Sequence, residues 1–258
     1  MQTVNLDHCA ILGVDVGFSA RRATTGIAWV VDGEVEAVRT HSDWPRRRLE
    51  LPTSQSFDMI AIDGPLLPDG ADPETDRLCE RVFLRRPFHN RCKPGLSHFG
   101  TGRHLRRAAV ETADQFRSLI KPGAATCFGG PFVIGNVPII EAFPNAFLGL
   151  LLSGDAFAER PKPRKRFDWL YDKALSEGVF PRLLDFLDWR GPGLLQRLSN
   201  EHDHERRAAL ICLLTAATAA VGKGTTVGND VGGYLWMPPR ELWSDWASAG
   251  MDSSGQIA

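Results

Sequence analysis

The sequence has few cysteines, almost no net charge and no long hydrophobic run. Its five cysteines are odd in number and none forms a CxxC pair, so neither a zinc ribbon nor a disulfide framework is expected. Reduced thiols in a cytoplasmic protein are the default. No apolar run reaches the roughly 18 residues that a membrane span needs, so no membrane association is expected. The first residues also lack the basic and apolar segments of a signal peptide.

The charge is balanced overall but unevenly distributed. The chain has 258 residues, 43% of them hydrophobic, and a net charge of -1. This length allows a large core, and we predict a single domain over residues 1–258. The positive residues are mostly arginines in short clusters. Guanidinium groups suit bidentate phosphate recognition, whereas a solvated face of salt bridges is an equally good explanation.

Short apolar runs rich in β-branched residues predict strands. The stretches 10–17 and 26–31 are followed by Asp32-Gly33, a strong hairpin signal, and by a third run at 34–41. A fourth strand is predicted from Phe57 to Asp63 and a fifth within 137–144. The order of elements predicts an α/β protein with a mixed five-stranded sheet and helices on both faces.

The segments around the fifth strand differ in character. Residues 69–135 form a helical and loop insertion, or cap, between strands four and five, and 87–104 within it has the composition of a loop. The most apolar helix is expected within 199–224, with Asn200 as its N-cap. The tail 232–243 contributes a short final strand.

Acidic residues recur at the ends of the predicted strands. Asp15, Asp63 and Glu141 follow separate apolar runs, and ligands of open α/β sheets bind at the carboxyl ends of parallel strands. Neighbouring carboxylates repel unless a cation or a proton compensates, and Mg²⁺ takes such oxygen ligands. Each acid also has a simpler explanation as a turn or strand-end surface residue.

The last helix offers a fourth acid. Glu205 shares a stripe with Ala208, Ala209 and Cys212, small residues that allow a helix to approach a sheet closely. Asp203 lies about 160° away from Glu205 on an ideal helix, so the two are not expected to serve one site equally. Acids near a helix N-terminus are also favoured by the helix dipole alone.

Several short motifs, in this order, resemble a known family. They are GVDVG followed by GIAW, IAIDGPL, RLCE, IIEAFPNAFLGLL, HERRAALICLLTAATAA and GYLWMPP. Over nearly the whole chain they resemble the uncharacterised family of predicted RNase H-like nucleases. The resemblance implies an RNase H-like fold whose first three strands are antiparallel and whose later strands are parallel. It also implies Mg²⁺ or Mn²⁺ held by Asp15, Asp63 and Glu205.

One position departs from the family pattern. Members often carry an acid on the last helix followed three residues later by Asp-Ala, whereas this chain has Glu205 followed by Ala208. Either Asp203 or Glu141 supplies the missing ligand, or the site is degenerate. Glu141 matches a glutamate that is typical of the family but has no place in the superfamily's metal scheme.

The leading hypothesis is a metal-dependent nuclease that hydrolyses phosphodiester bonds by a two-metal mechanism. Its catalytic residues are Asp15, Asp63, Glu205 and Glu141, and its metal ligands are Asp15, Asp63, Glu205 and Asp203. Nucleic acid is the expected partner, contacted by Arg21, Arg22, Arg103 and Arg106. Basic residues of the insertion alternate with Phe88 and Phe99, a composition that suits a phosphate backbone with stacked bases.

Two alternatives stay open. The stretch Gly13–Gly17 matches the GxDxG strand of the sugar-kinase and actin superfamily, which would make the chain a nucleotide-binding phosphotransferase, but no GxxxxGK[ST] loop is present. A non-catalytic nucleic-acid-binding scaffold with a degenerate site is the other. The oligomeric state is also left open, a homodimer included.

Overall fold

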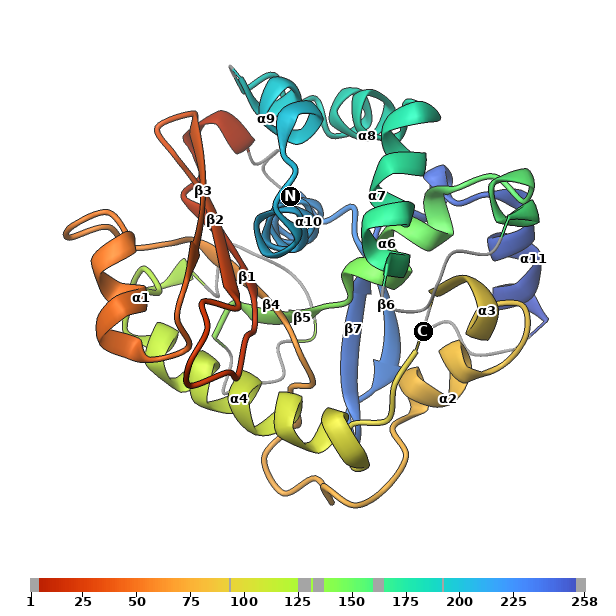
Figure 1. The fold of residues 1–258 in the computed structure, drawn as a ribbon, viewed down its shortest axis with the longest axis horizontal. Coiled ribbons are helices and arrows are strands. Elements are labelled where there is room, and N and C mark those ends of the chain that lie inside the picture. The colour runs from red at the N-terminus through yellow and green to blue at the C-terminus, as the bar shows by residue number, and fades with distance from the viewer. Residues whose placement is uncertain are drawn as a thin grey trace.

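The architecture is an α/β sandwich around one mixed sheet (Figure 1). We describe a computed structural model over residues 5–92, 94–124, 131, 137–159, 165–191 and 193–253. Seven strands are hydrogen-bonded in the order β3-β2-β1-β4-β5-β7-β6. The strands are β1 (Ile11–Asp15), β2 (Thr25–Val31), β3 (Glu34–Thr40), β4 (Met59–Asp63), β5 (Ile139–Ala142), β6 (Thr225–Asn229) and β7 (Gly233–Met237).

The first three strands form the predicted antiparallel meander. Asp32 and Gly33 connect β2 to β3 with φ angles of 51° and 77°, as a two-residue type I′ turn requires. Strand β4 then pairs with β1 in parallel, and β5 pairs with β4 in parallel. The carboxyl ends of β1, β4 and β5 therefore lie at the same edge of the sheet.

The prediction of five strands is wrong in number. Strand β7, which is the short final strand expected within 232–243, pairs with β5 in parallel, and β6 closes the sheet antiparallel to β7. Strand β6 was missed because its sequence, TTVGN, is polar and glycine-containing, and Val227 is its only fully buried residue. Its place in the sheet comes from pairing with the more apolar β7, which periodicity within β6 cannot reveal.

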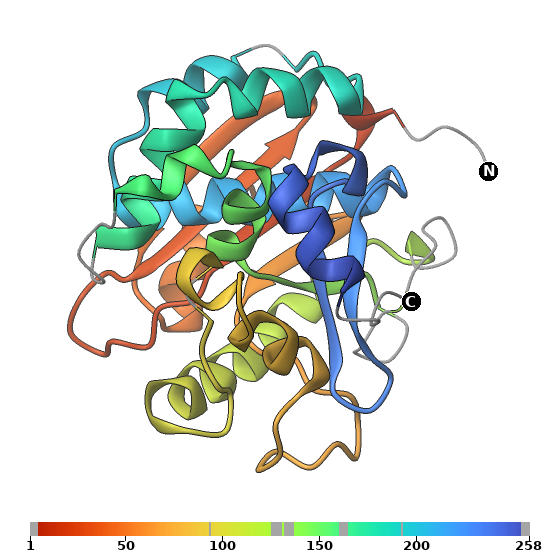
Figure 2. The same cartoon turned by 90° about the vertical axis from the view of Figure 1, so that its right-hand side faces the viewer.

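Helix α10 (His204–Ala220) covers one face of the sheet and is almost entirely buried. A Cβ atom on Gly13 would overlap the backbone of Ala209 and Leu213, and one on Gly26 would overlap the backbone of Glu205. The two glycines and the small residues of α10 thus let the helix lie directly on β1 and β2. An outer layer covers α10 in turn (Figures 1 and 2). It consists of α6 (Pro144–Leu151), α7 (Arg166–Ser176), α8 (Val179–Leu187) and α9 (Leu194–Asn200).

Helices α4 (Gly100–Arg117) and α1 (Trp44–Glu50) cover the opposite face. Ala109, Ala113 and Phe116 of α4 pack against the sheet, and Phe116 meets Trp44 of α1 edge to face at 5.3 Å. The described part of the insertion 69–135 therefore builds a layer of the core. Helix α4 and the short α3 (His89–Cys92) begin inside the segment expected to be a loop, because packing outweighs its low helix propensity.

The remaining helices surround β6 and β7. They are α2 (Leu78–Leu84) and α11 (Asp245–Asp252). The 3₁₀ turns are η1 (Leu6–His8), which precedes β1, η2 (Asp155–Ala158) and η4 (Arg240–Leu242). Asn200 is not the N-cap of the last helix: α9 ends there, and Asp203 caps α10 instead by accepting a hydrogen bond from the Arg206 backbone N–H.

Two findings bear on the compositional expectations. Cys9, Cys79, Cys92 and Cys212 are buried free thiols, and Cys127 lies outside the described residues. In the part of the chain that the structure describes, no helix combines the length and apolarity that crossing a membrane requires.

Candidate active site

Two aspartates lie side by side at the carboxyl ends of β1 and β4. Asp15 and Asp63 are direct partners in the parallel register, so their side chains point to the same face of the sheet. That face is the one covered by α10, because Gly13, two residues before Asp15, faces the α10 backbone. The structure therefore brings together the two acids that the strand ends predicted.

The surroundings of Asp15 are negatively charged. Burial, followed by the carboxylates of Asp63, Glu205 and Asp203, holds the pKa of Asp15 well above its usual range. All of the neighbouring charges that shift this pKa are acidic. The ionised form of Asp15 is thus destabilised in the folded chain, and a cation placed beside it would relieve the repulsion.

Asp203 and Glu205 converge on one guanidinium group. Arg39 of β3 contacts Asp203 Oδ2 at 3.1 Å and Glu205 Oε1 at 3.3 Å. The expected separation of about 160° does not apply, since Asp203 precedes the helix and has extended backbone. Burial opposes ionisation of Asp203, but the hydrogen bond from the Arg206 backbone N–H and the contact with Arg39 lower its pKa.

Carboxylate oxygens suit Mg²⁺ or Mn²⁺, and two features of the described residues qualify the fit. No three His, Cys, Asp or Glu side chains among them are already arranged as ligands of one ion. Arg39 also holds Glu205. Mg²⁺ is often held by one or two carboxylates and keeps several waters, so Asp15 and Asp63 are the two described residues that would hold such an ion. The thiol of Cys212 stays protonated, since burial and these two aspartates raise its pKa.

Glu141 lies on the other face of the sheet. Its register partner on β4 is Ile62, whereas Asp63 faces Ala142. The Glu141 carboxylate accepts two hydrogen bonds from Arg77, at 2.9 and 2.6 Å, and one from the Leu66 backbone N–H at 2.8 Å. The motifs RLCE and IIEAFP thus meet in a buried ion pair, which separates Glu141 from the aspartate pair.

A small cavity of ≈100 Å³ lies at the end of β4, beside Asp63. Asp63, Glu80 and Glu141 line it together with apolar side chains that include Phe83 and Leu105. Glu80 Oε1 accepts a hydrogen bond from the Ser97 backbone N–H at 3.1 Å. Glu80 Oε2 is buried and has no partner among the described residues. The cavity therefore presents one carboxylate oxygen with unused acceptor capacity.

The arginines predicted to contact phosphate differ in their surroundings. Arg21 and Arg22 are exposed on the loop after β1 and have no acidic partner among the described residues. Arg103 is bound to Glu74 at 2.7 Å. Arg106 is buried and donates to the Pro73 carbonyl. Arg21, Arg22 and Arg103 are thus exposed, the last with an acidic partner, whereas Arg106 is buried.

The aromatic side chains of this region also divide into two groups. Phe88 is buried in the core around α2 and α3, so it is not a stacking residue. Phe99 is 73% exposed at the start of α4. Phe18 is 49% exposed and stacks on His104 of α4, with ring centroids 6.4 Å apart. The loop after Asp15 therefore presents an aromatic ring that the sequence motifs did not single out.

Two arginines that support the site were missed by sequence reasoning. Arg39 neutralises the acids at the start of α10. Arg47, which the sequence places in a basic cluster, is 2% exposed and donates to the Gly17 carbonyl and the Thr25 hydroxyl. It also reaches Thr112 of α4 at 2.7 Å, so it fixes the base of the loop that follows Asp15. No local pattern identifies such long-range partners.

Comparison of the chain with family models, with curated proteins and with solved structures finds no match in any of the three.

We predict that Glu141→Gln destabilises the protein by about 3 kcal/mol, because it removes the carboxylate nearest to the buried Arg77 and leaves that guanidinium only the longer contact with Glu80 at 3.7 Å. Urea denaturation measures this loss, and Glu50→Gln, at an exposed residue, is the control expected to change little. A fully stable Glu141→Gln variant would show that the ion pair is not a structural requirement.

We predict that Asp15→Asn stabilises the folded chain near neutral pH when no divalent cation is added. The raised pKa means that ionised Asp15 costs stability above that pKa, and that this cost vanishes below the unfolded-chain value of about 3.9. The melting temperature should rise by about 2–4 °C, corresponding to about 1 kcal/mol. Exposed Asp188→Asn should leave the melting temperature unchanged; equal behaviour of the two variants would contradict the electrostatic account.

Proposed function

We propose that the chain is a metal-dependent nuclease with an RNase H-like core, acting on phosphodiester bonds of nucleic acid. The observation that carries this proposal is the aspartate pair. Asp15 and Asp63 are register partners at the ends of two parallel strands, and the Glu205 carboxylate contributes to the raised pKa of Asp15. The strand order β3-β2-β1-β4-β5, with an antiparallel meander followed by parallel strands, agrees with the fold that the motif resemblance implies.

In this proposal Asp15 and Asp63 hold Mg²⁺ or Mn²⁺, and Glu205 is the third candidate ligand. The bound ion would supply a lowered pKa for its water and charge stabilisation at the scissile phosphate. Arg21 and Arg22 offer guanidinium groups to the phosphate backbone. Phe18, supported by His104, offers a surface on which a base can stack. Arg47 keeps the start of this loop in place through Gly17.

A cleavage assay tests the proposal. Single-stranded, duplex and branched DNA and RNA are incubated with the protein in Mg²⁺ or Mn²⁺. We expect Asp15→Asn to lose at least about 100-fold in rate, equivalent to about 2.7 kcal/mol of barrier. The matched control Asp188→Asn should retain the full rate. Cleavage by Asp15→Asn at the rate of the unmodified chain would reject the proposed site.

The alternative of a non-catalytic nucleic-acid-binding scaffold is favoured by one observation, the occupation of Glu205 and Asp203 by Arg39. A scaffold would bind the same nucleic acids in a salt-dependent manner without cleaving them. The phosphotransferase alternative has no comparable support in the described residues.

The substitution Arg39→Gln distinguishes the metal-dependent nuclease from the non-catalytic scaffold. It removes a positive charge from beside Glu205, so we expect Mn²⁺ to bind about 3- to 10-fold more tightly, measured as metal-dependent thermal stabilisation. Arg190→Gln, which removes an exposed arginine elsewhere, is the control. An Mn²⁺ affinity that does not change in Arg39→Gln would exclude Glu205 and Asp203 from the metal site. If neither the unmodified chain nor Arg39→Gln binds Mn²⁺, the scaffold alternative is favoured.

A further inference from the structure

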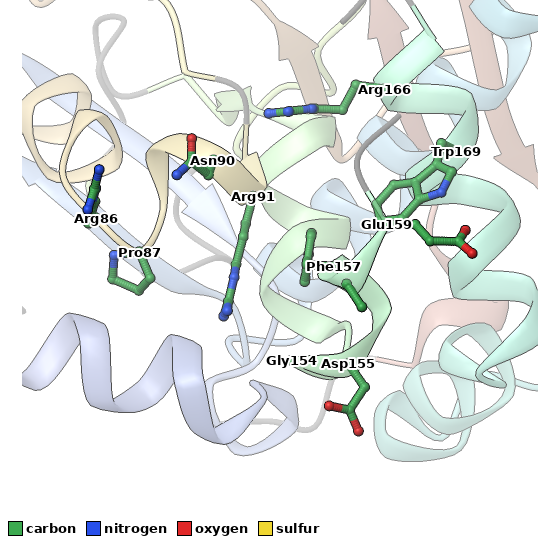
Figure 3. Close-up of a pocket in the computed structure, with 11 residues that line it drawn as sticks. Arg86, Pro87, Asn90, Arg91, Gly154, Asp155, Phe157, Glu159, Arg166 and Trp169 are labelled. Atoms are coloured by element: carbon green, nitrogen blue, oxygen red, sulfur yellow. The ribbon is translucent and has the colours of Figure 1, made fainter. Parts of the chain in front are cut away.

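A second, larger cavity lies apart from the aspartate pair. Neither Asp15 nor Asp63 lines it, and it shares no lining residue with the small cavity beside Asp63. It has a volume of ≈520 Å³ and is formed by α3 with the preceding Arg86-Pro87, by η2 and by the start of α7 (Figure 3). This volume falls within the range of about 300–1,000 Å³ that is usual for small-molecule sites.

The lining is rich in arginines that lack acidic partners. Arg86, Arg91 and Arg166 line the cavity, and none of them forms an ion pair with a described residue. Figure 3 shows Arg166 extending from α7 toward the helix that carries Asn90 and Arg91. Asp155 and Glu159 also line the cavity, but Figure 3 shows both carboxylates turned away from Arg166. Guanidinium groups that face a cavity without counterions favour an anionic ligand.

Arg91 is held in place by aromatic rings. Its guanidinium carbon lies 4.2 Å from the centroid of Trp246 and 5.2 Å from that of Phe157, and these two rings meet edge to face at 5.7 Å. Its Nη1 atom is buried and has no hydrogen-bond acceptor among the described residues. The two rings therefore fix the position of the Arg91 guanidinium, whose positive charge lies beside the cavity without a counterion among the described residues and adds to the attraction for an anion.

We propose that this cavity binds a nucleotide, with its phosphate on Arg166. Arginine forks match the paired oxygens of a phosphate and retain their charge at any physiological pH. Trp169 provides an aromatic ring in the wall and Asn90 an amide, the two groups that a nucleobase uses for stacking and hydrogen bonding. The inference does not depend on the nuclease proposal, since the two sites have separate residues.

Titration of the full chain with AMP tests the proposal, followed by calorimetry and by the fluorescence of Trp169 and Trp246 beside the cavity. Inorganic phosphate and adenosine are titrated separately to resolve the two halves of the ligand. We expect saturable AMP binding, with Arg166→Gln weakening it about 10-fold. Arg190→Gln and Asp15→Asn should bind AMP as the unmodified chain does.

The outcomes are distinguishable. Absence of saturable AMP binding at millimolar concentration, or equal affinity in Arg166→Gln, overturns the proposal. Phosphate binding as tight as AMP overturns the nucleobase part, and loss of AMP binding in Asp15→Asn assigns the ligand to the other site. Arg91→Gln loses the contact with the two aromatic rings and is therefore a variant that can fail to fold. Arg166→Gln and Arg86→Gln test AMP binding in that case, because neither arginine packs on those rings. A failure here leaves the cleavage assay unaffected.

Discussion

The close approach of α10 to β1 and β2 is the constraint on which the rest of the structure depends. Gly13 and Gly26 leave no side chain between the strand backbones and the helix backbone. The helix therefore carries Glu205 to β2 at the position opposite Asp15, and acids from the strands and from the helix share one region. The sheet covers one side of α10, and the outer helices cover the other side, so the helix is almost entirely buried.

The acids of this region are compensated unequally. Glu141 has Arg77, while Asp203 and Glu205 share Arg39. Burial and the carboxylates of Asp63, Glu205 and Asp203 all raise the pKa of Asp15. A fold selected for stability alone would not place a carboxylate at such a position, because burying charges of like sign is unfavourable. This raised pKa of Asp15 is the physical argument behind the role proposed for it.

Much of the fold was predictable, and the limits have physical causes. Asp32-Gly33 fixes the hairpin locally, and the apolar runs that end at Asp15 and Asp63 fix two parallel strand ends. The opposite orientation of Glu141 depends on the register between β4 and β5, which neither strand specifies alone. Arg39 was missed because its partner Asp203 lies 164 residues away in sequence. The motif resemblance implied the meander and the parallel strands but not the addition of β7 and β6.

Strand β3, finally, is one edge of the sheet, and an edge exposes backbone groups that can recruit a strand from another molecule. Here Arg197 of α9 donates to the Ala37 carbonyl at 2.6 Å. Glu34 and Glu36 are exposed along the strand, and such charges oppose edge-to-edge pairing. The chain thus carries, along its own sheet edge, both a side-chain cap on a backbone carbonyl and charges that disfavour pairing with a strand of another molecule.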